Sequence, residues 1–200
     1  MFPTQIEHHF AIATVTWTRD GIRTESSGYP DPNLDPEPES FGSGFDHLTM
    51  SELLKGVELV RKDESKVDAG EALKGKIVGL YFSAGWCPPC RQFTPKLKRF
   101  FDKVKAANKN FEVIFVSRDR EADDLVEYFD DHHGDWTYLE FGNPKIQELL
   151  EKYEVKTIPA FRIIKPDGTV IVEDARTEVA EKGAEGALEL YENWEAFYEM

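Results

Sequence analysis

The stretch SAGWCPPCRQF, residues 83–93, contains Cys87 and Cys90, the only two cysteines of this 200-residue chain. It follows the nearly continuous apolar run KIVGLYF at residues 76–82, which predicts a strand buried on both faces of a sheet. Beyond the cysteines, apolar side chains recur at helical spacing and predict a long amphipathic helix. They are Phe93, Leu97, Phe100, Phe101 and Val104. The thiols therefore lie where a central strand ends and a helix begins.

From residue 46 onward, predicted strands and helices alternate. Alternating or β-branched apolar runs and a PDGT turn indicate extended segments at residues 57–62, 111–117, 136–141, 159–165 and 170–174. Apolar periodicity and an Asn-Pro start indicate helices at residues 68–73, 121–129, 143–153 and 185–198. This order predicts an α/β fold, a sheet with helices on both faces and the cysteines at the carboxyl edge of its strands.

The last predicted helix is expected to cover the sheet with apolar side chains. These are Leu188, Tyr191, Trp194 and Phe197, or the nearby Leu190. Its remaining surface is acidic, since residues 173–199 hold nine acids and two bases. Two interpretations stay open: a solvated helical face, or a docking surface for a basic partner.

Residues 1–45 differ in composition from the rest of the chain. Residues 19–45 are rich in proline and glycine and bury too little to offset their ordering entropy. Residues 10–17, FAIATVTW, are β-prone and form either an extra strand or an apolar tail that binds a partner. We predict a largely irregular N-terminal extension and linker at residues 1–45, followed by one folded domain at residues 46–200.

The overall composition limits the classes of partner. The chain carries 38 acidic and 24 basic residues, a net charge of −14, which repels nucleic acid and anionic membranes. No apolar run approaches the roughly 18 residues of a membrane span, and the N-terminus lacks the basic start and unbroken apolar core of a signal peptide. A secreted domain stabilised by disulfides usually has more than one cysteine pair, so we expect this protein in the reducing cytosol, or in the nucleus. We also expect a monomer.

Two thiols three positions apart could belong to a metal site, a structural disulfide or a redox centre. A structural zinc ion usually needs four ligands, and the five histidines are not spaced to complete such a site; His132 and His133 are interpreted as surface residues. A bridge over so short a loop removes little unfolded-state entropy. A redox centre fits best, because a helix N-terminus lowers the pKa of a thiol and favours the reactive thiolate. We expect no metal and no organic cofactor.

Within this redox interpretation the two cysteines have different roles. Cys87 is expected at the helix N-terminus as the attacking nucleophile, and Cys90, one turn inside, as the more buried thiol that resolves the mixed disulfide. Pro88 and Pro89 have no N–H to donate to the Cys87 sulfur, so we expect its pKa to be lowered only moderately. Arg91 is the basic residue nearest the thiols and the candidate to act on that pKa or on an anionic substrate.

The segment YFSAGWCPPCRQFTP, residues 81–95, resembles the active site of the thioredoxin superfamily, and its Trp-Cys-Pro-Pro-Cys sequence is similar to that of the tryparedoxin and nucleoredoxin branch. Pro95 stands where the family kinks its active-site helix, and VKTIPAF at residues 155–161 resembles the family's cis-proline loop. ART at residues 175–177 resembles a segment after the last tryparedoxin strand. The resemblance covers about residues 50–199 and implies a thioredoxin-like fold, in which a central mixed sheet is flanked by helices.

The resemblance also implies a set of site residues. Cys87 would be the nucleophile and Cys90 the resolving thiol. The residues that would contact the substrate are Trp86, Pro88, Pro89, Arg91, Ile158, Pro159 and Arg176. Pro159 would lie against the disulfide after a cis bond, which leaves the Ile158 backbone to pair with an extended partner chain. Arg176 matches a position that contacts glutathione-type carboxylates, or it is a surface residue that balances neighbouring acids.

Two positions depart from the pattern of related proteins. Thioredoxin itself has a buried aspartate six residues before the first cysteine, which serves in proton transfer; here, as in tryparedoxins, that residue is a tyrosine, Tyr81. Proton transfer from Cys90 therefore needs another base or water. Arg118 stands where tryparedoxins typically have tryptophan, which argues against a trypanothione-like substrate.

These observations predict a thiol–disulfide oxidoreductase that reduces protein disulfides through a Cys87/Cys90 dithiol cycle. Its partners would be disulfide-containing proteins and an upstream reductant, either a reductase or a small thiol. Two alternatives stay open. One is a dedicated electron donor to a peroxidase. The other is a redox-sensitive adaptor that binds partners without turnover, which the N-terminal linker and apolar segment would suit.

Overall fold

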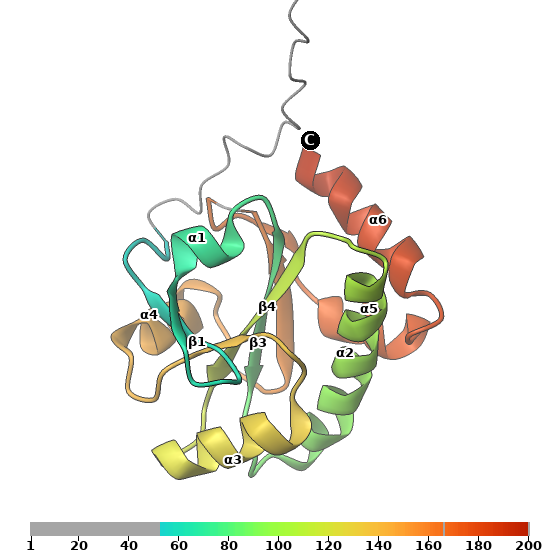
Figure 1. Cartoon of the computed structure of the whole chain (residues 1–200). Helices are drawn as coiled ribbons and strands as arrows, with labels where there is room; N and C mark the ends of the chain where they lie inside the picture. The colour runs from blue at the N-terminus through green and yellow to red at the C-terminus, as the bar shows by residue number, and fades with distance from the viewer. Residues whose placement is uncertain (1–52, 166, 200) are drawn as a thin grey trace, which may run out of the picture. The chain divides into compact units, whose positions relative to one another are not determined.

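The computed structural model describes residues 53–165 and 167–199 (Figure 1). The predicted extension at residues 1–45, its candidate strand and the boundary to the folded domain lie outside these residues. Within them the chain forms one seven-stranded sheet in the order β2-β1-β5-β4-β3-β6-β7, with both parallel and antiparallel pairs. The predicted α/β fold, with a central mixed sheet flanked by helices, is confirmed.

The two central strands were predicted from their apolar runs and are buried along their whole length. The strands are β1 (Glu58–Val60), β2 (Lys66–Asp68), β3 (Ile77–Ser83), β4 (Phe111–Ser117), β5 (Thr137–Leu139), β6 (Ala160–Ile164) and β7 (Val170–Val172). β3 pairs parallel with β4 and antiparallel with β6. β2 was not predicted, because its Lys-Val-Asp sequence carries no strand signal; its pairing with β1 forms it.

Five of the six helices follow the predicted periodicity. The helices are α1 (Ala69–Leu73), α2 (Pro88–Ala106), α3 (Ala122–His132), α4 (Pro144–Lys152), α5 (Ala175–Lys182) and α6 (Ala187–Glu199). As predicted, Asn143 caps α4 by accepting the Lys145 N–H, with Pro144 in the first turn. α5 was not predicted as a helix, because only Ala175 and Val179 of its eight residues are buried.

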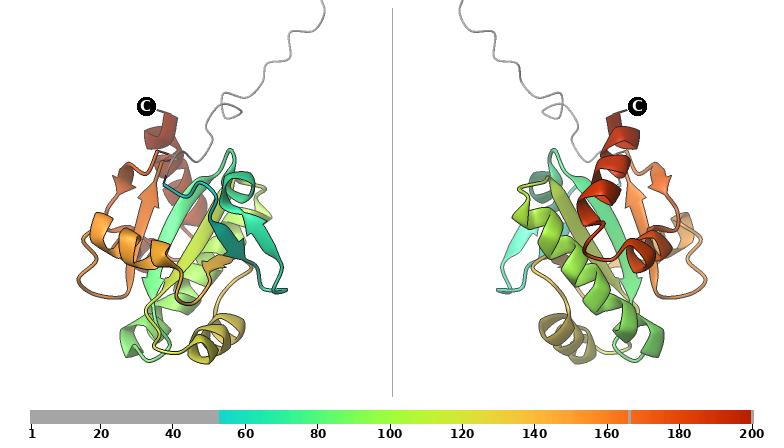
Figure 2. Two further views of the ribbon diagram at one scale, coloured as in Figure 1. Left: turned by 90° about the vertical axis from the view of Figure 1, so that its left-hand side faces the viewer. Right: turned by 90° about the vertical axis from the view of Figure 1, so that its right-hand side faces the viewer.

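The helices cover the sheet on both faces (Figures 1 and 2). α1 and α4 pack on one face, where aliphatic side chains such as Leu80, Ile114 and Leu149 form the core. α2, α5 and α6 pack on the other face, which is largely aromatic. No helix in the described part of the chain is long and apolar enough to cross a membrane.

The burial pattern of α6 corrects one prediction. Leu188 and Phe197 were expected to cover the sheet, but they are 41% and 53% exposed. Tyr191, Trp194 and the alternative Leu190 are buried as predicted, and the helix also buries Ala187 and Tyr198. These positions fall on one helical face at spacings of three and four residues, and Leu188 and Phe197 lie off that face.

Candidate redox-active site

The cysteine turn lies at the carboxyl end of β3, as predicted. Cys87 is in an extended conformation at the N-cap of α2, and Pro88 and Pro89 form the first turn of that helix. Cys87 and Cys90 are joined by a disulfide, with their Cα atoms 5.2 Å apart. Cys90 is fully buried and Cys87 is 4% exposed. The prediction that Cys90 is the more buried thiol is confirmed, and Cys87 is the one nearer the solvent.

A second segment packs against the cysteines from the loop before β6. The Ile158–Pro159 bond is cis, as the resemblance implied. The carbonyl oxygen of Ile158 lies 3.7 Å from Cys87 Sγ, and the Ile158 side chain packs against the buried cluster of Ala84, Cys87 and Cys90. In the reduced protein the Cys87 thiol can donate to this carbonyl.

Trp86 forms the exposed part of the cysteine turn. Its side chain is 54% exposed, as expected for a residue that shields the site rather than a core aromatic. Its indole Nε1 donates to the Arg118 carbonyl oxygen at 3.1 Å, and the Arg120 guanidinium carbon lies 5.8 Å from the ring centroid. The loop after β4 thus contacts the ring through Arg118 and Arg120, while about half of the side chain stays exposed.

Asp119, in that same loop, holds the backbone of the cysteine turn, and the sequence analysis missed it. Its Oδ1 accepts the Gly85 N–H at 2.8 Å, and its Oδ2 accepts the Ser117 hydroxyl at 2.7 Å. Partial burial raises the pKa of Asp119, against the effect of these two bonds. The signal that could have found it is its place just after a buried parallel strand, at the edge where such sheets gather their functional side chains.

Beneath the cysteine turn lies a buried group of hydroxyl side chains, which we call the floor: Tyr81, Ser83, Thr94 and Tyr128. Thr94 Oγ1 lies 2.7 Å from the Tyr81 hydroxyl, 2.5 Å from the Tyr128 hydroxyl and 2.9 Å from the Cys90 carbonyl oxygen. The Ser83 hydroxyl lies 3.2 Å from that of Tyr128. Burial raises the pKa of Tyr81 far above its ordinary value, so its hydroxyl stays neutral.

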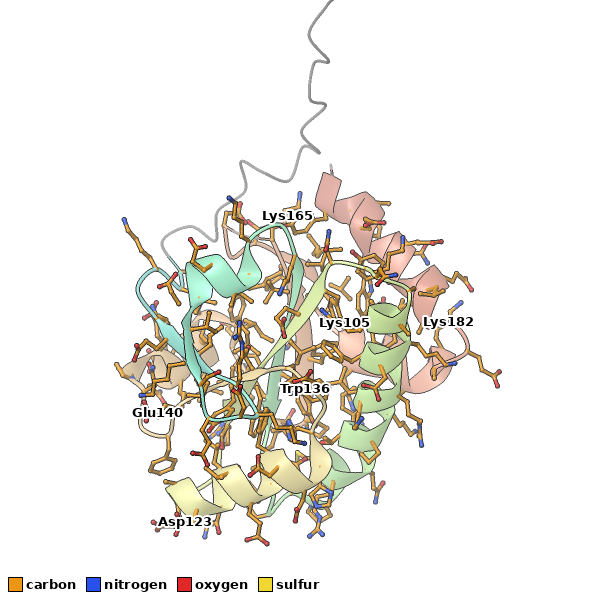
Figure 3. All side chains as sticks on the ribbon, viewed as in Figure 1. Lys105, Asp123, Trp136, Glu140, Lys165 and Lys182 are labelled. Carbon is orange, nitrogen blue, oxygen red and sulfur yellow. A yellow bond between two sulfur atoms is a disulfide. The ribbon has the colours of Figure 1, made fainter. Side chains whose placement is uncertain are left out.

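His133 corrects another prediction, because it is buried rather than on the surface; its neighbour His132 is exposed. Its Nδ1 accepts from the indole of Trp136, a residue that Figure 3 labels in the interior. Burial lowers the pKa of His133 well below its ordinary value. The neutral ring therefore carries its proton on Nε2, which finds no hydrogen-bond partner among the described residues.

A pocket of about 260 Å³ opens beside the cysteine turn. Trp86 and Arg91 line it from the turn, and Asp124, Glu127 and Asp131 line it from α3. Arg91, which was predicted near the thiols, is thus placed with Trp86 on an exposed wall that faces acidic side chains.

Two further predictions concern residues outside this pocket. Pro88 and Pro89 are exposed beside Cys87. Arg176 is exposed in the first turn of α5, and within the described ranges no hydrogen bond or ion pair joins it to the cysteine turn or to the Ile158 loop. Trp86, Pro88, Pro89 and Arg91 thus lie in or next to the cysteine turn, and Ile158 and Pro159 lie in the loop before β6, whereas Arg176 follows β7 and, among the described residues, makes no such bond to either segment.

The described residues contain no group of three or more His, Cys, Asp or Glu side chains placed to hold a metal ion. The chemistry available to the site is that of two sulfurs: a nucleophile at the solvent edge of a helix N-terminus and a second thiol one turn below it.

Comparison with known proteins identifies a family to which this chain is similar. A family model described as thioredoxin-like matches residues 75–170. Tryparedoxin of Trypanosoma brucei brucei is 40% identical over 134 residues, which cover 66% of this chain and 90% of that protein. The crystal structure of thioredoxin from Wuchereria bancrofti superposes with a TM-score of 0.61 at 42% identity, and the match covers 69% of this chain and 95% of that one.

A much longer relative matches a similar share of this chain. The Arabidopsis thaliana protein named "Probable nucleoredoxin 1" is 38% identical over 140 residues, which cover 68% of this chain and 24% of that protein. The aligned segment thus spans about a quarter of that relative. The chain belongs to the thioredoxin superfamily, in the branch of tryparedoxins and nucleoredoxins, whose members are oxidoreductases that use a redox-active disulfide without a cofactor.

Proposed function

We propose that this protein reduces protein disulfides through a dithiol cycle of Cys87 and Cys90. The observation that carries the proposal is the joined pair at the start of α2, with Cys87 toward solvent, Cys90 buried and the cis-proline loop against both. The helix N-terminus favours the thiolate of Cys87. The buried second thiol has access to Cys87 but little access to bulk solvent.

The cycle balances as two exchange steps. The Cys87 thiolate attacks one sulfur of the substrate disulfide, which forms a mixed disulfide and releases the other substrate sulfur as a thiolate that takes a proton. The Cys90 thiolate then attacks the Cys87 sulfur and releases the second substrate thiol. The substrate gains two electrons, the protein is left with the Cys87–Cys90 disulfide, and an upstream reductase or small thiol restores the dithiol.

The exposed residues around Cys87 are the proposed substrate surface. We define the rim as Trp86, Pro88 and Pro89, which offer apolar contact area around the nucleophile. A substrate in extended conformation would pair with the Ile158 backbone beside Pro159. Arg91 would meet an acidic group of the substrate; the corresponding role for Arg176 has no support from a contact with this site.

A Cys90→Ser variant tests the proposal. It stops the cycle at the mixed disulfide, so proteins captured on Cys87 accumulate and can be identified by mass spectrometry. The matched control is Cys87→Ser, which leaves only the buried thiol and should capture nothing. Repeated reduction of insulin by the wild-type protein, supplied with dithiothreitol, should be lost in both variants. If Cys90→Ser captures no protein, the dithiol mechanism is wrong.

The same assays separate the alternatives. A dedicated electron donor would turn over with a peroxidase far faster than with insulin. A redox-sensitive adaptor would bind its partner stoichiometrically, with different affinity in the oxidised and reduced states, and would not turn over. We propose that the protein is a monomer that works in the cytosol or the nucleus, where small thiols can return the Cys87–Cys90 disulfide to the dithiol form.

A further inference from the structure

The hydrogen bonds of the floor have only one possible set of directions. Thr94 Oγ1 contacts the Cys90 carbonyl oxygen, which can only accept, so the single Thr94 proton points to Cys90. Both Tyr81 and Tyr128 must then donate to Thr94. Because the Tyr128 proton is used in this way, Ser83 donates to Tyr128. Three hydroxyls therefore converge through Thr94 on one backbone carbonyl of the cysteine turn.

The peptide group between Cys90 and Arg91 extends this series of hydrogen bonds to Cys87. The Cys90–Arg91 peptide accepts from Thr94 at its carbonyl and donates from its N–H to the Cys87 carbonyl oxygen at 3.1 Å. The Cys87 N–H in turn donates to the Ala84 carbonyl oxygen at 3.2 Å. A planar peptide unit is thus tied at one end to the floor and at the other to the residue that carries the nucleophile. Hydrogen bonds in such a series strengthen one another.

We propose that Thr94 is a positioning residue for the redox reaction, because its hydroxyl, fixed by Tyr81 and Tyr128, holds the turn that sets the two sulfurs against each other. This inference rests on the proposed dithiol cycle. Thr94 acts through the Cys90 carbonyl and need not touch the reacting sulfurs. Tyr81, in the place of thioredoxin's buried aspartate, then serves to orient Thr94 rather than to hold a charge.

A fixed turn has a chemical consequence. It raises the effective concentration of the Cys90 thiol at the Cys87 sulfur. That concentration sets the equilibrium between dithiol and disulfide, and it sets the rate at which the Cys90 thiolate resolves a mixed disulfide on Cys87. Loosening the turn lowers both, so the pair becomes easier to reduce and slower to release substrate.

A pair of substitutions at one position isolates the hydroxyl. Thr94→Val removes it at nearly constant volume, and Thr94→Ser keeps it while removing the methyl group. Two quantities are measured. The first is the equilibrium constant between dithiol and disulfide in mixtures of reduced and oxidised glutathione. The second is a rate: the reduced protein is mixed with the disulfide of thionitrobenzoate, Cys87 releases one thionitrobenzoate, and the rate at which Cys90 releases the other is recorded. In Thr94→Val we expect the equilibrium to move about tenfold toward the dithiol, about 30 mV, and the second release to slow by about tenfold. Thr94→Ser should stay within about twofold of wild type in both.

Each outcome decides the matter. Should Thr94→Val not fold, the quadruple variant Tyr81→Phe/Ser83→Ala/Thr94→Val/Tyr128→Phe removes all four hydroxyls of the floor together, so that none is left without a partner, and keeps most of the floor's shape. Wild-type values in the folded variant overturn the inference, as do equal shifts in the Val and Ser variants, which would assign the effect to the methyl group. If the wild-type protein itself gives no second release, the dithiol cycle fails; if it does and the variants match it, only the inference fails.

Discussion

The rim and the floor of the cysteine turn are built from opposite kinds of side chain. The rim is apolar and exposed, and the half-exposed Trp86 side chain donates one hydrogen bond, to the Arg118 carbonyl oxygen. The floor is polar and buried, and its hydroxyls satisfy one another and the Cys90 carbonyl. The solvent exposure of a rim side chain changes little on folding. A floor side chain loses its hydrogen bonds to water on folding, so its contribution to stability depends on the hydrogen bonds it makes with its neighbours. Recognition can therefore vary at the rim while the geometry of the sulfurs is kept by the floor.

The largest effect on stability is expected at the floor. Tyr128→Ala should lower the free energy of unfolding by about 3–5 kcal/mol, because it leaves a cavity beside Phe115 and His133 as well as an unpaired Ser83 hydroxyl. Tyr128→Phe, which removes only the hydroxyl, should cost about 1–2 kcal/mol. Urea denaturation of the oxidised proteins measures both. A loss below about 1 kcal/mol in Tyr128→Ala would contradict the description of the floor as a tightly packed unit.

Asp119 joins Gly85 of the cysteine turn to Ser117 at the end of β4, and its removal should have an intermediate effect on stability. Asp119→Ala leaves the Gly85 N–H and the Ser117 hydroxyl without their acceptor, so we expect a loss of about 1–2 kcal/mol. The control is Asp123→Ala, an exposed acid at the start of α3 (Figure 3), which should change stability by no more than about 0.5 kcal/mol. Equal losses in the two variants would show that the carboxylate of Asp119 does not hold the cysteine turn.

His133, packed against Tyr81 and Tyr128, makes the stability of the floor depend on pH. Its pKa in the folded protein is lowered, whereas the unfolded chain takes up the proton at about pH 6.5. Stability from this group is therefore present above about pH 6.5 and is lost as the pH falls below it, by up to about 1.4 kcal/mol per pH unit. Denaturation between pH 7.5 and 5 measures the slope. His133→Asn, which retains an acceptor for Trp136 but does not titrate, should have a shallower slope; an unchanged slope would assign the pH dependence to other groups.

The smallest effect on stability is expected at the rim. Trp86→Ala should change the free energy of unfolding by less than about 1 kcal/mol, since the ring is half exposed. It should raise the KM for insulin about fivefold, because it removes apolar contact area beside the nucleophile. Phe197→Ala on α6, where the side chain is equally exposed at 53%, is the matched control and should leave the KM unchanged. A KM that rises equally in both variants would deny the rim a role in recognition.

Local patterns account for most of the predicted architecture. We could predict β3, β4 and α2 without knowing their distant partners. Consecutive apolar residues indicate the buried strands, and apolar residues at helical spacing indicate the helix. β2 and α5 escaped prediction because pairing with β1 and packing against α2 and β6 form them, and neither contact leaves a periodic trace in the sequence. The burial of His133 escaped for the same reason, since aromatic side chains from other segments enclose it.

What the sequence determined by itself is the chemistry: two thiols at a strand-to-helix edge, their order of exposure, and the neighbouring Trp86 and Pro159. The thiols, their order of exposure and the adjacent Trp86 follow from residue type and short-range spacing, whereas Pro159 was assigned to the site by the resemblance to the family. What only the tertiary structure decided is the support of that chemistry, from Asp119 beneath Gly85 to Thr94 beneath Cys90. Carboxylates and hydroxyls are common along any chain, so the sequence does not show which of them supports the site. The role of Asp119 or Thr94 can be assigned only when the fold places it within hydrogen-bond distance of the cysteine turn.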